Sequence, residues 1–75
     1  MSEFPIESEI AGTVWKIEAA SGDKLKEEGV IMILESMKME IPVLAPEAGE
    51  IVKILVAEGD TVREGQELAT MSPCV

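Results

Sequence analysis

The feature that most constrains the fold of this chain is an internal repeat. Residues 11–17, AGTVWKI, match residues 48–54, AGEIVKI, thirty-seven positions later. A unit of this size cannot bury an apolar face by itself. We therefore expect the two halves to pack on each other about an approximate two-fold axis.

Turn residues continue the match beyond these segments. Gly22-Asp23 aligns with Gly59-Asp60, and a one-residue slip then aligns Gly29 with Gly65. Glycine accepts positive φ, and an aspartate side chain can bond back to nearby backbone amides. We therefore expect Asp23 and Asp60 to form turns rather than to act as general acids or bases.

The segments between the turns have the character of β-strands. They are short, rich in Val and Ile, bounded by Gly or Pro, and without a sustained 3.6-residue period. They comprise residues 12–19, 30–34, 39–44, 50–56 and 66–71. Only residues 23–28 have helical character, and they are too few to form more than a turn. We predict an all-β fold, a flattened barrel or sandwich, as a single domain over residues 1–75 with repeats at about 11–34 and 48–71 and a hairpin at 35–40.

Charge and composition exclude several classes of partner. The 75 residues include 6 basic and 15 acidic side chains, a net charge of −9, which would repel a nucleic-acid backbone and an anionic membrane surface. No apolar run approaches the ~20 residues of a membrane span, and the N-terminus lacks the pattern of a secretory signal. We expect a cytoplasmic protein with neither nucleic acid nor membrane as partner.

Catalytic and metal-binding residues are not predicted. The sequence has no His, so we propose no His/Cys metal cluster, and its only cysteine, Cys74, cannot form an internal disulfide. It has no nucleophile–base pair and no glycine-rich phosphate loop. We expect a protein that enzymes act on rather than an enzyme.

The most distinctive motif, Glu35-Ser36-Met37-Lys38-Met39-Glu40, lies in the connection between the halves. Lys38 is midway between the first and last matched residues, Ala11 and Gly65. We expect a tight hairpin with Met37 and Lys38 at its turn, at the opposite end of the domain from the chain termini. A lysine at such a tip is accessible to a modifying enzyme.

The two methionines beside Lys38 are unusual at a turn. Methionine is flexible and polarizable, and it is common on surfaces that a partner grips. The alternative is that Met37 or Met39 packs onto the core, which the alternation of Met39 with Ile41 and Val43 makes plausible for Met39.

Met37-Lys38-Met39, with a glutamate on each side and Ala45-Pro46 downstream, resembles the biotinyl domain family, the biotin carboxyl carrier domains of carboxylases. The resemblance runs from about Glu7 to Met71 and includes the duplicated Gly-Asp turns. It is closest to the small stand-alone biotin/lipoyl attachment proteins. It implies two four-stranded antiparallel sheets with the target lysine on a hairpin between the fourth and fifth strands.

The resemblance also implies a function. Biotin protein ligase would attach biotin to Lys38, with Met37, Met39, Glu35, Glu40 and Ser36 as its recognition residues. The biotin would accept a carboxyl group from an ATP-dependent biotin carboxylase and carry it to a carboxyltransferase that acts on an acyl-CoA or an oxo acid. The domain itself would be a non-catalytic carrier.

Two alternatives remain open at this point. Lipoyl domains share the duplicated barrel and hairpin lysine but usually have Asp-Lys-Ala at the tip, so lipoate is the less favoured cofactor. The second alternative is an unmodified β-barrel that acts as an interaction module, with Lys38 an ordinary turn residue.

Overall fold

The computed structural model describes residues 3–73, which form eight β-strands and no helix. The strands are β1 (Phe4–Glu7), β2 (Gly12–Ile17), β3 (Lys24–Leu25), β4 (Val30–Ser36), β5 (Met39–Leu44), β6 (Gly49–Ile54), β7 (Thr61–Val62) and β8 (Glu67–Pro73). The predicted all-β class is confirmed. Within this range no helix has the length and apolarity to cross a membrane.

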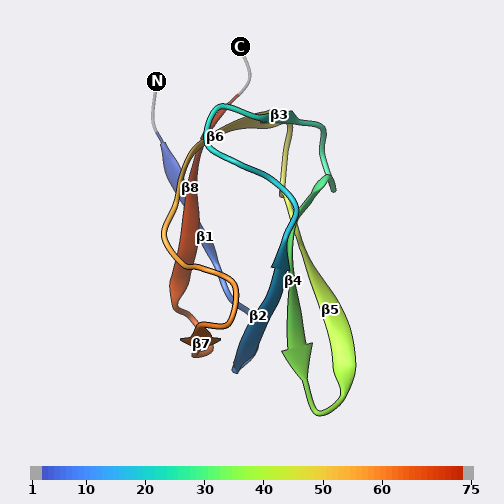
Figure 1. Ribbon diagram of the computed structural model, residues 1–75. Helices are drawn as coiled ribbons and strands as arrows, with labels where there is room; N and C mark the ends of the chain where they lie inside the picture. Colours follow the sequence, from blue (N-terminus) through green and yellow to red (C-terminus); the bar gives the residue numbers. More distant parts are fainter. Residues whose placement is uncertain (1–2, 74–75) are drawn as a thin grey trace.

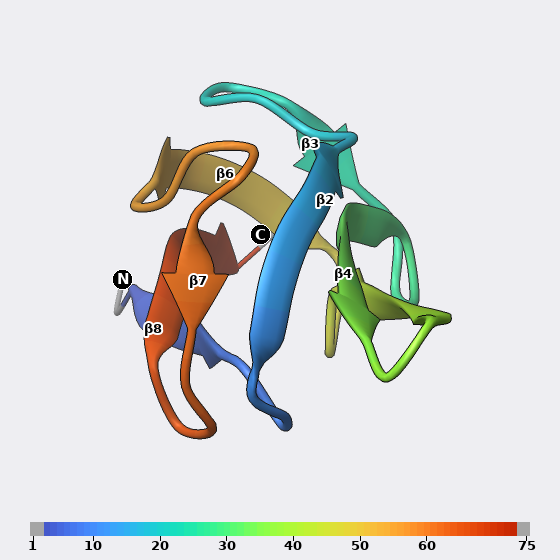
Figure 2. The ribbon, with the colours of Figure 1, turned by 60° about the horizontal axis from the view of Figure 1, so that its bottom comes forward.

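The strands form two four-stranded antiparallel sheets, with the orders β1-β8-β6-β3 and β5-β4-β2-β7 (Figures 1 and 2). Each sheet takes strands from both halves of the chain, because β1 and β3 join β6 and β8 while β7 joins β2, β4 and β5. The halves are thus interlocked through their sheets. The predicted sandwich of two four-stranded sheets is confirmed.

The internal repeat is visible in the strand register. In the β2–β4 pair, Thr13 lies opposite Glu35; in the β6–β8 pair, Glu50 lies opposite Ser72, and each residue is thirty-seven positions after its counterpart. Both pairs contain an irregularity between matched residues, at Trp15 in β2 and at the aligned residue of β6. The two halves therefore fold alike, down to their β-bulges.

The structural repeat is longer than the segments 11–34 and 48–71. Pro5 of β1 lies opposite Thr70 of β8, as Pro42 of β5 lies opposite Ile33 of β4. Strands β1 and β5 are therefore equivalent edge strands, and the matched units run over residues 4–36 and 41–73. Neither β1 nor the two-residue strands β3 and β7 stood out in the sequence.

The predicted slip of the repeat at Gly29 is wrong. Glu28 has a φ of 68° and Gly65 a φ of 84°, and these residues are thirty-seven apart. The hydrogen bond from the Gly29 N–H to the Lys26 carbonyl likewise matches the one from the Gln66 N–H to the Arg63 carbonyl. Glu28, not Gly29, is therefore the counterpart of Gly65, because this turn needs a left-handed residue and Glu28 adopts that conformation.

The two Gly-Asp turns behave as predicted. One carboxylate oxygen of Asp23 accepts a hydrogen bond from the Ala20 N–H at 2.9 Å, and Asp60 accepts one from the Ala57 N–H at the same distance. These bonds use the aspartates in turn formation.

The core lies between the sheets and is shared by both halves. Its buried aliphatic residues come largely in matched pairs: Val14 and Ile51, Ile31 and Leu68, Met32 and Ala69, Leu34 and Met71. Each half thus covers the apolar face of the other, as the size of the repeat requires.

Candidate functional site

The β4–β5 hairpin places Lys38 at its tip. Ser36 lies opposite Met39 as the last strand pair, so Met37 and Lys38 alone form the turn. Their φ angles, 53° and 65°, are both positive. A two-residue loop of this kind is the type I′ turn, whose twist matches that of the strands it joins. The predicted tight hairpin with these two residues at the turn is confirmed.

The turn is built from residues that do not favour its conformation. Type I′ turns prefer Asn-Gly or Gly-Gly, whereas a left-handed backbone costs other residues roughly 1–2 kcal/mol each. Both Met37 and Lys38 adopt it. The paired strands on either side hold the turn in this strained conformation. Backbone strain of this kind concentrates at functional sites.

The methionines beside Lys38 face solvent. Met37 is 91% exposed and Met39 is 62% exposed, and Lys38 is also exposed. Met39 does lie on the same face of β5 as Ile41 and Val43, but it stands beyond the end of the core. The alternative in which either methionine packs into the core is therefore wrong.

The polar residues of the motif occupy the strands below the turn. Glu35 and Glu40 lie directly opposite each other and are both exposed, while Ser36 is half-buried. Leu34, next to Glu35, is fully buried, so side-chain alternation directs the two glutamates to the outer face of the sheet. Two like charges opposite each other destabilise a hairpin slightly. Hairpin stability therefore does not account for this pair, whereas electrostatic attraction to a partner would.

Gly12 supports the base of the hairpin. A Cβ at this position would lie 2.6 Å from the Glu35 carbonyl oxygen, so only glycine lets β2 approach β4 this closely. Its counterpart Gly49 has the same relation to the Ser72 carbonyl oxygen at the other end of the molecule. The Ala-Gly pairs in the repeat therefore mark two close strand contacts, one of which holds the hairpin.

The hairpin projects from one end of the molecule, whereas β1 begins and β8 ends at the other (Figure 1). Lys38 is thus accessible from several sides. Its primary amine can be acylated, and its flexible stem would extend the reach of an attached group. The residue types and exposure at this tip fit an amide-linked cofactor.

Other candidate chemistry does not converge here. Among residues 3–73, no group of three or more acidic, His or Cys side chains is placed to hold a metal ion. Cys74 lies outside the described residues. The residues that the sequence singled out, from Glu35 to Glu40, are instead brought together in one hairpin.

Comparison with known proteins identifies the family. Residues 3–71 match the biotin/lipoyl family model described as "Biotin-requiring enzyme". The chain is 41% identical to the biotin/lipoyl attachment protein of Bacillus subtilis over 85% of this chain and 88% of that one. It is 40% identical to the biotinylated protein TB7.3 homolog of Mycobacterium leprae over 89% of this chain and 94% of that one.

A solved structure has the same fold within a much larger protein. The crystal structure of the Kluyveromyces lactis urea carboxylase superposes with a TM-score of 0.90 and 35% identity, over 96% of this chain and 6% of that one. The predicted family, covalently attached biotin as the cofactor and the role of carrier rather than catalyst are confirmed. The chain belongs to the biotin/lipoyl attachment domain family.

Proposed function

We propose that Lys38 is the biotin attachment residue and that the biotinylated domain serves as carrier for a biotin-dependent carboxylase. The observation that carries this proposal is the position of Lys38 at an exposed, two-residue turn in a chain that matches the biotin/lipoyl family model described as "Biotin-requiring enzyme". Biotin, when attached, supplies a ureido nitrogen that takes up and releases a carboxyl group. The acyl-CoA or oxo acid that would receive the carboxyl group stays a prediction.

Attachment requires a specific set of steps from this chain. The Lys38 amine attacks the activated carboxyl carbon of biotinyl-adenylate, loses a proton as the amide bond forms, and displaces AMP. Amide formation removes one positive charge, so the net charge of the chain changes from −9 to −10. The tip then carries the two negative charges of Glu35 and Glu40 without a neighbouring lysine charge.

Recognition by biotin protein ligase would use the residues around Lys38. Met37 and Met39 offer exposed, adaptable apolar contacts, which is otherwise an unfavourable arrangement at a turn. Glu35 and Glu40 offer charge to a basic surface on the ligase. The rigid turn gives the lysine a fixed starting point for acylation.

Co-production with a biotin protein ligase, followed by intact mass and streptavidin capture, tests this function. The wild-type chain should gain one biotin, and Lys38→Arg should gain none. Lys53→Arg is the matched control, because Lys53 is an exposed strand lysine away from the hairpin, and it should be biotinylated as the wild type is. Equal biotinylation of the Lys38→Arg variant would refute the assignment.

Lipoate is a second candidate, favoured by one observation: the Bacillus subtilis relative is named for attachment of both cofactors. The same exposed amine can form an amide with either acid. Selection between them would then depend on the residues beside Lys38. If the methionines select for biotin, co-production with a lipoate ligase should give little or no lipoylated chain. A chain that stays unmodified with either ligase would support the interaction-module alternative.

The partners beyond the ligase are assigned by class only. A biotin carboxylase and a carboxyltransferase, as subunits or domains, would each need to reach the hairpin in turn. The cytoplasmic location stays a prediction.

A further inference from the structure

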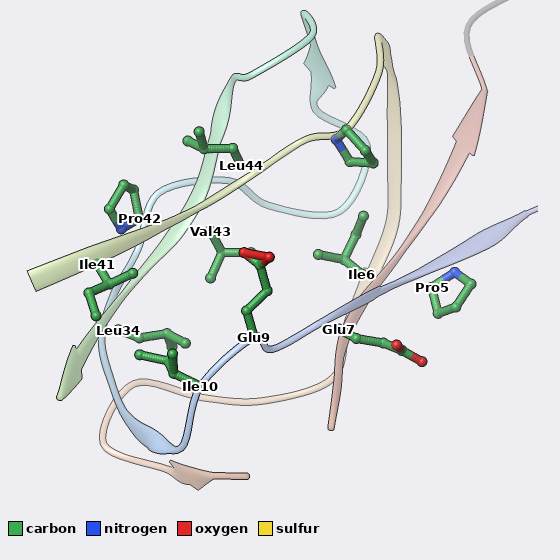
Figure 3. A pocket seen from close by; sticks show the side chains of 11 residues that line it. Pro5, Ile6, Glu7, Glu9, Ile10, Leu34, Ile41, Pro42, Val43 and Leu44 are labelled. Carbon is green, nitrogen blue, oxygen red and sulfur yellow. The ribbon is translucent and has the colours of Figure 1, made fainter. Parts of the chain in front are cut away.

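A groove runs between the edge strands β1 and β5, with a volume of about 320 Å³ (Figure 3). Ile6 and Ile10 come from the first half of the chain, and Ile41 and Val43 come from the second half. This volume is at the lower end of the range of small-molecule sites. The groove is lined mainly by apolar side chains.

The groove stays open because neither edge strand can pair with the other along its length. Pro5 in β1 and Pro42 in β5 have no N–H to donate, and proline is the residue that blunts sheet edges. A proline can occupy only the strand pairs that exchange no hydrogen bonds, so its carbonyl is directed away from the paired strand. Both edges therefore present hydrogen-bond acceptors at the groove.

Glu9 adds a charged acceptor. Glu9 lines the groove, and its side chain projects toward the space between the two strands, whereas the side chain of Glu7 points away from this region (Figure 3). Among the residues that the structure describes, none of those lining the groove is a lysine or an arginine. The groove thus favours a largely apolar group that donates hydrogen bonds and carries no negative charge.

The attached cofactor can reach this groove. Ile41 is three residues after Lys38, and because β5 begins directly after the turn, their Cα atoms are at most about 10 Å apart at the rise of a β-strand. Eleven bonds, one of them the amide C–N bond, join the Lys38 Cα to the ring of an amide-linked biotin, and they span about 14 Å at normal bond lengths. The ring can therefore enter the end of the groove formed by Ile10, Leu34 and Ile41.

We infer that the groove between β1 and β5 is a resting site for the biotin ring attached to Lys38 of the same chain, an inference that rests on the proposed function. The ring matches the groove in chemistry, because its two ureido N–H groups are donors and its thioether ring is apolar. A short tether gives the ring an effective concentration in the ~mM range, so a weak interaction suffices to populate the site.

Nuclear Overhauser measurements on isotope-labelled, biotinylated protein test this inference. Intact mass first establishes that one biotin is attached, so that failure of the proposed function is recognised separately. We expect contacts from the protons of the biotin ring to the methyl groups of Ile10, Ile41 and Val43. Contacts confined to Lys38, Met37 and Met39 in a fully biotinylated sample would overturn the resting site.

Matched variants separate the groove from the rest of the surface. Ile10→Trp fills the groove and should remove the ring-to-methyl contacts, whereas Glu47→Trp places the same side chain at the counterpart position thirty-seven residues later and should retain them. Glu9→Ala removes an acceptor without adding bulk and should weaken the contacts at least twofold. Contacts that persist unchanged in both Ile10→Trp and Glu9→Ala would place the ring elsewhere and refute the inference.

Discussion

Within residues 3–73, three residues other than glycine have left-handed backbone conformations: Glu28, Met37 and Lys38. Comparison of the two halves of the repeat shows that the left-handed conformation of Glu28 serves turn formation alone. Glu28 corresponds to Gly65, whose added Cβ would meet no atom within 4 Å, so only the backbone conformation distinguishes the two positions. Met37 and Lys38 have strained backbones in the hairpin that presents the proposed attachment residue.

Separate substitutions at Glu28 and at Gly65 should change the free energy of unfolding in opposite directions. Glu28→Gly relieves the strain of a left-handed backbone but increases the conformational entropy of the unfolded chain. The free energy of unfolding should therefore rise by a net of about 0.5 kcal/mol. Gly65→Ala introduces the strain and should cost about 1 kcal/mol. Urea unfolding measures both changes.

A control for this pair is Glu27→Gly, which alters the neighbouring exposed residue and has no positive φ to relieve. It should destabilise the protein by roughly 0.5–1 kcal/mol. A Glu28→Gly variant that loses as much stability as this control would show that position 28 carries no backbone strain.

Residue-scale prediction from the sequence succeeded for the hairpin and its two turn residues but not for their backbone conformation. The central position of Lys38 and its neighbours Met37 and Met39 indicated a hairpin tip. Turn propensity does not select Met-Lys for a type I′ turn, so their left-handed conformations could not be predicted. The exposure of Met39 depends on how far the hairpin extends past the core, which alternation along one strand does not reveal.

Strand β4 is held at its hairpin end by the close approach of Gly12 in β2. The equivalent approach of Gly49 in β6 holds β8 at the opposite end of the molecule. The repeat therefore supplies a pair of positions with the same local packing but different distances from Lys38.

Alanine at either glycine should destabilise the protein by about 1–3 kcal/mol, because the new Cβ meets a backbone carbonyl that must move. Only Gly12→Ala displaces Glu35 and the base of the hairpin. We expect it to lower the rate of biotinylation about tenfold, since small misplacements of a reacting group are costly. Gly49→Ala should be biotinylated at the wild-type rate, and equal rates for the two variants would show that Gly12 does not position the hairpin.

Strand β1 illustrates what the sequence did not reveal at the level of elements. It has only four residues and contains Pro5, so it lacks the signature of a strand. Its match to β5, with Pro5 aligned to Pro42 and Ile6 to Val43, was the available signal at the spacing of thirty-seven. Without β1 there is no groove, so the groove could not be predicted from the strands that were expected.

The whole molecule consists of two interlocked halves with one core. Because each sheet contains strands from both halves, neither half can unfold and leave the other intact. Most small single domains unfold in one cooperative transition. The all-β class and the packing of the halves were predictable from the repeat, since its size leaves no other way to bury its apolar residues.

A small cavity in either half should therefore weaken the entire domain. Ile31→Val and Ile51→Val alter fully buried residues in the first and second halves, and each should cost about 0.5–1.5 kcal/mol. The transition followed by Trp15 fluorescence should coincide with that followed by far-UV circular dichroism in both variants. Separate transitions in Ile51→Val would contradict a shared core.

The most direct test of the account is the location of the modification on protein purified from its natural source. Peptide mass spectrometry should find one biotin in amide linkage to Lys38, and no biotin on the other lysines. A lipoyl group at Lys38, biotin on a different lysine, or an unmodified Lys38 in the cofactor-replete organism would contradict the central claim.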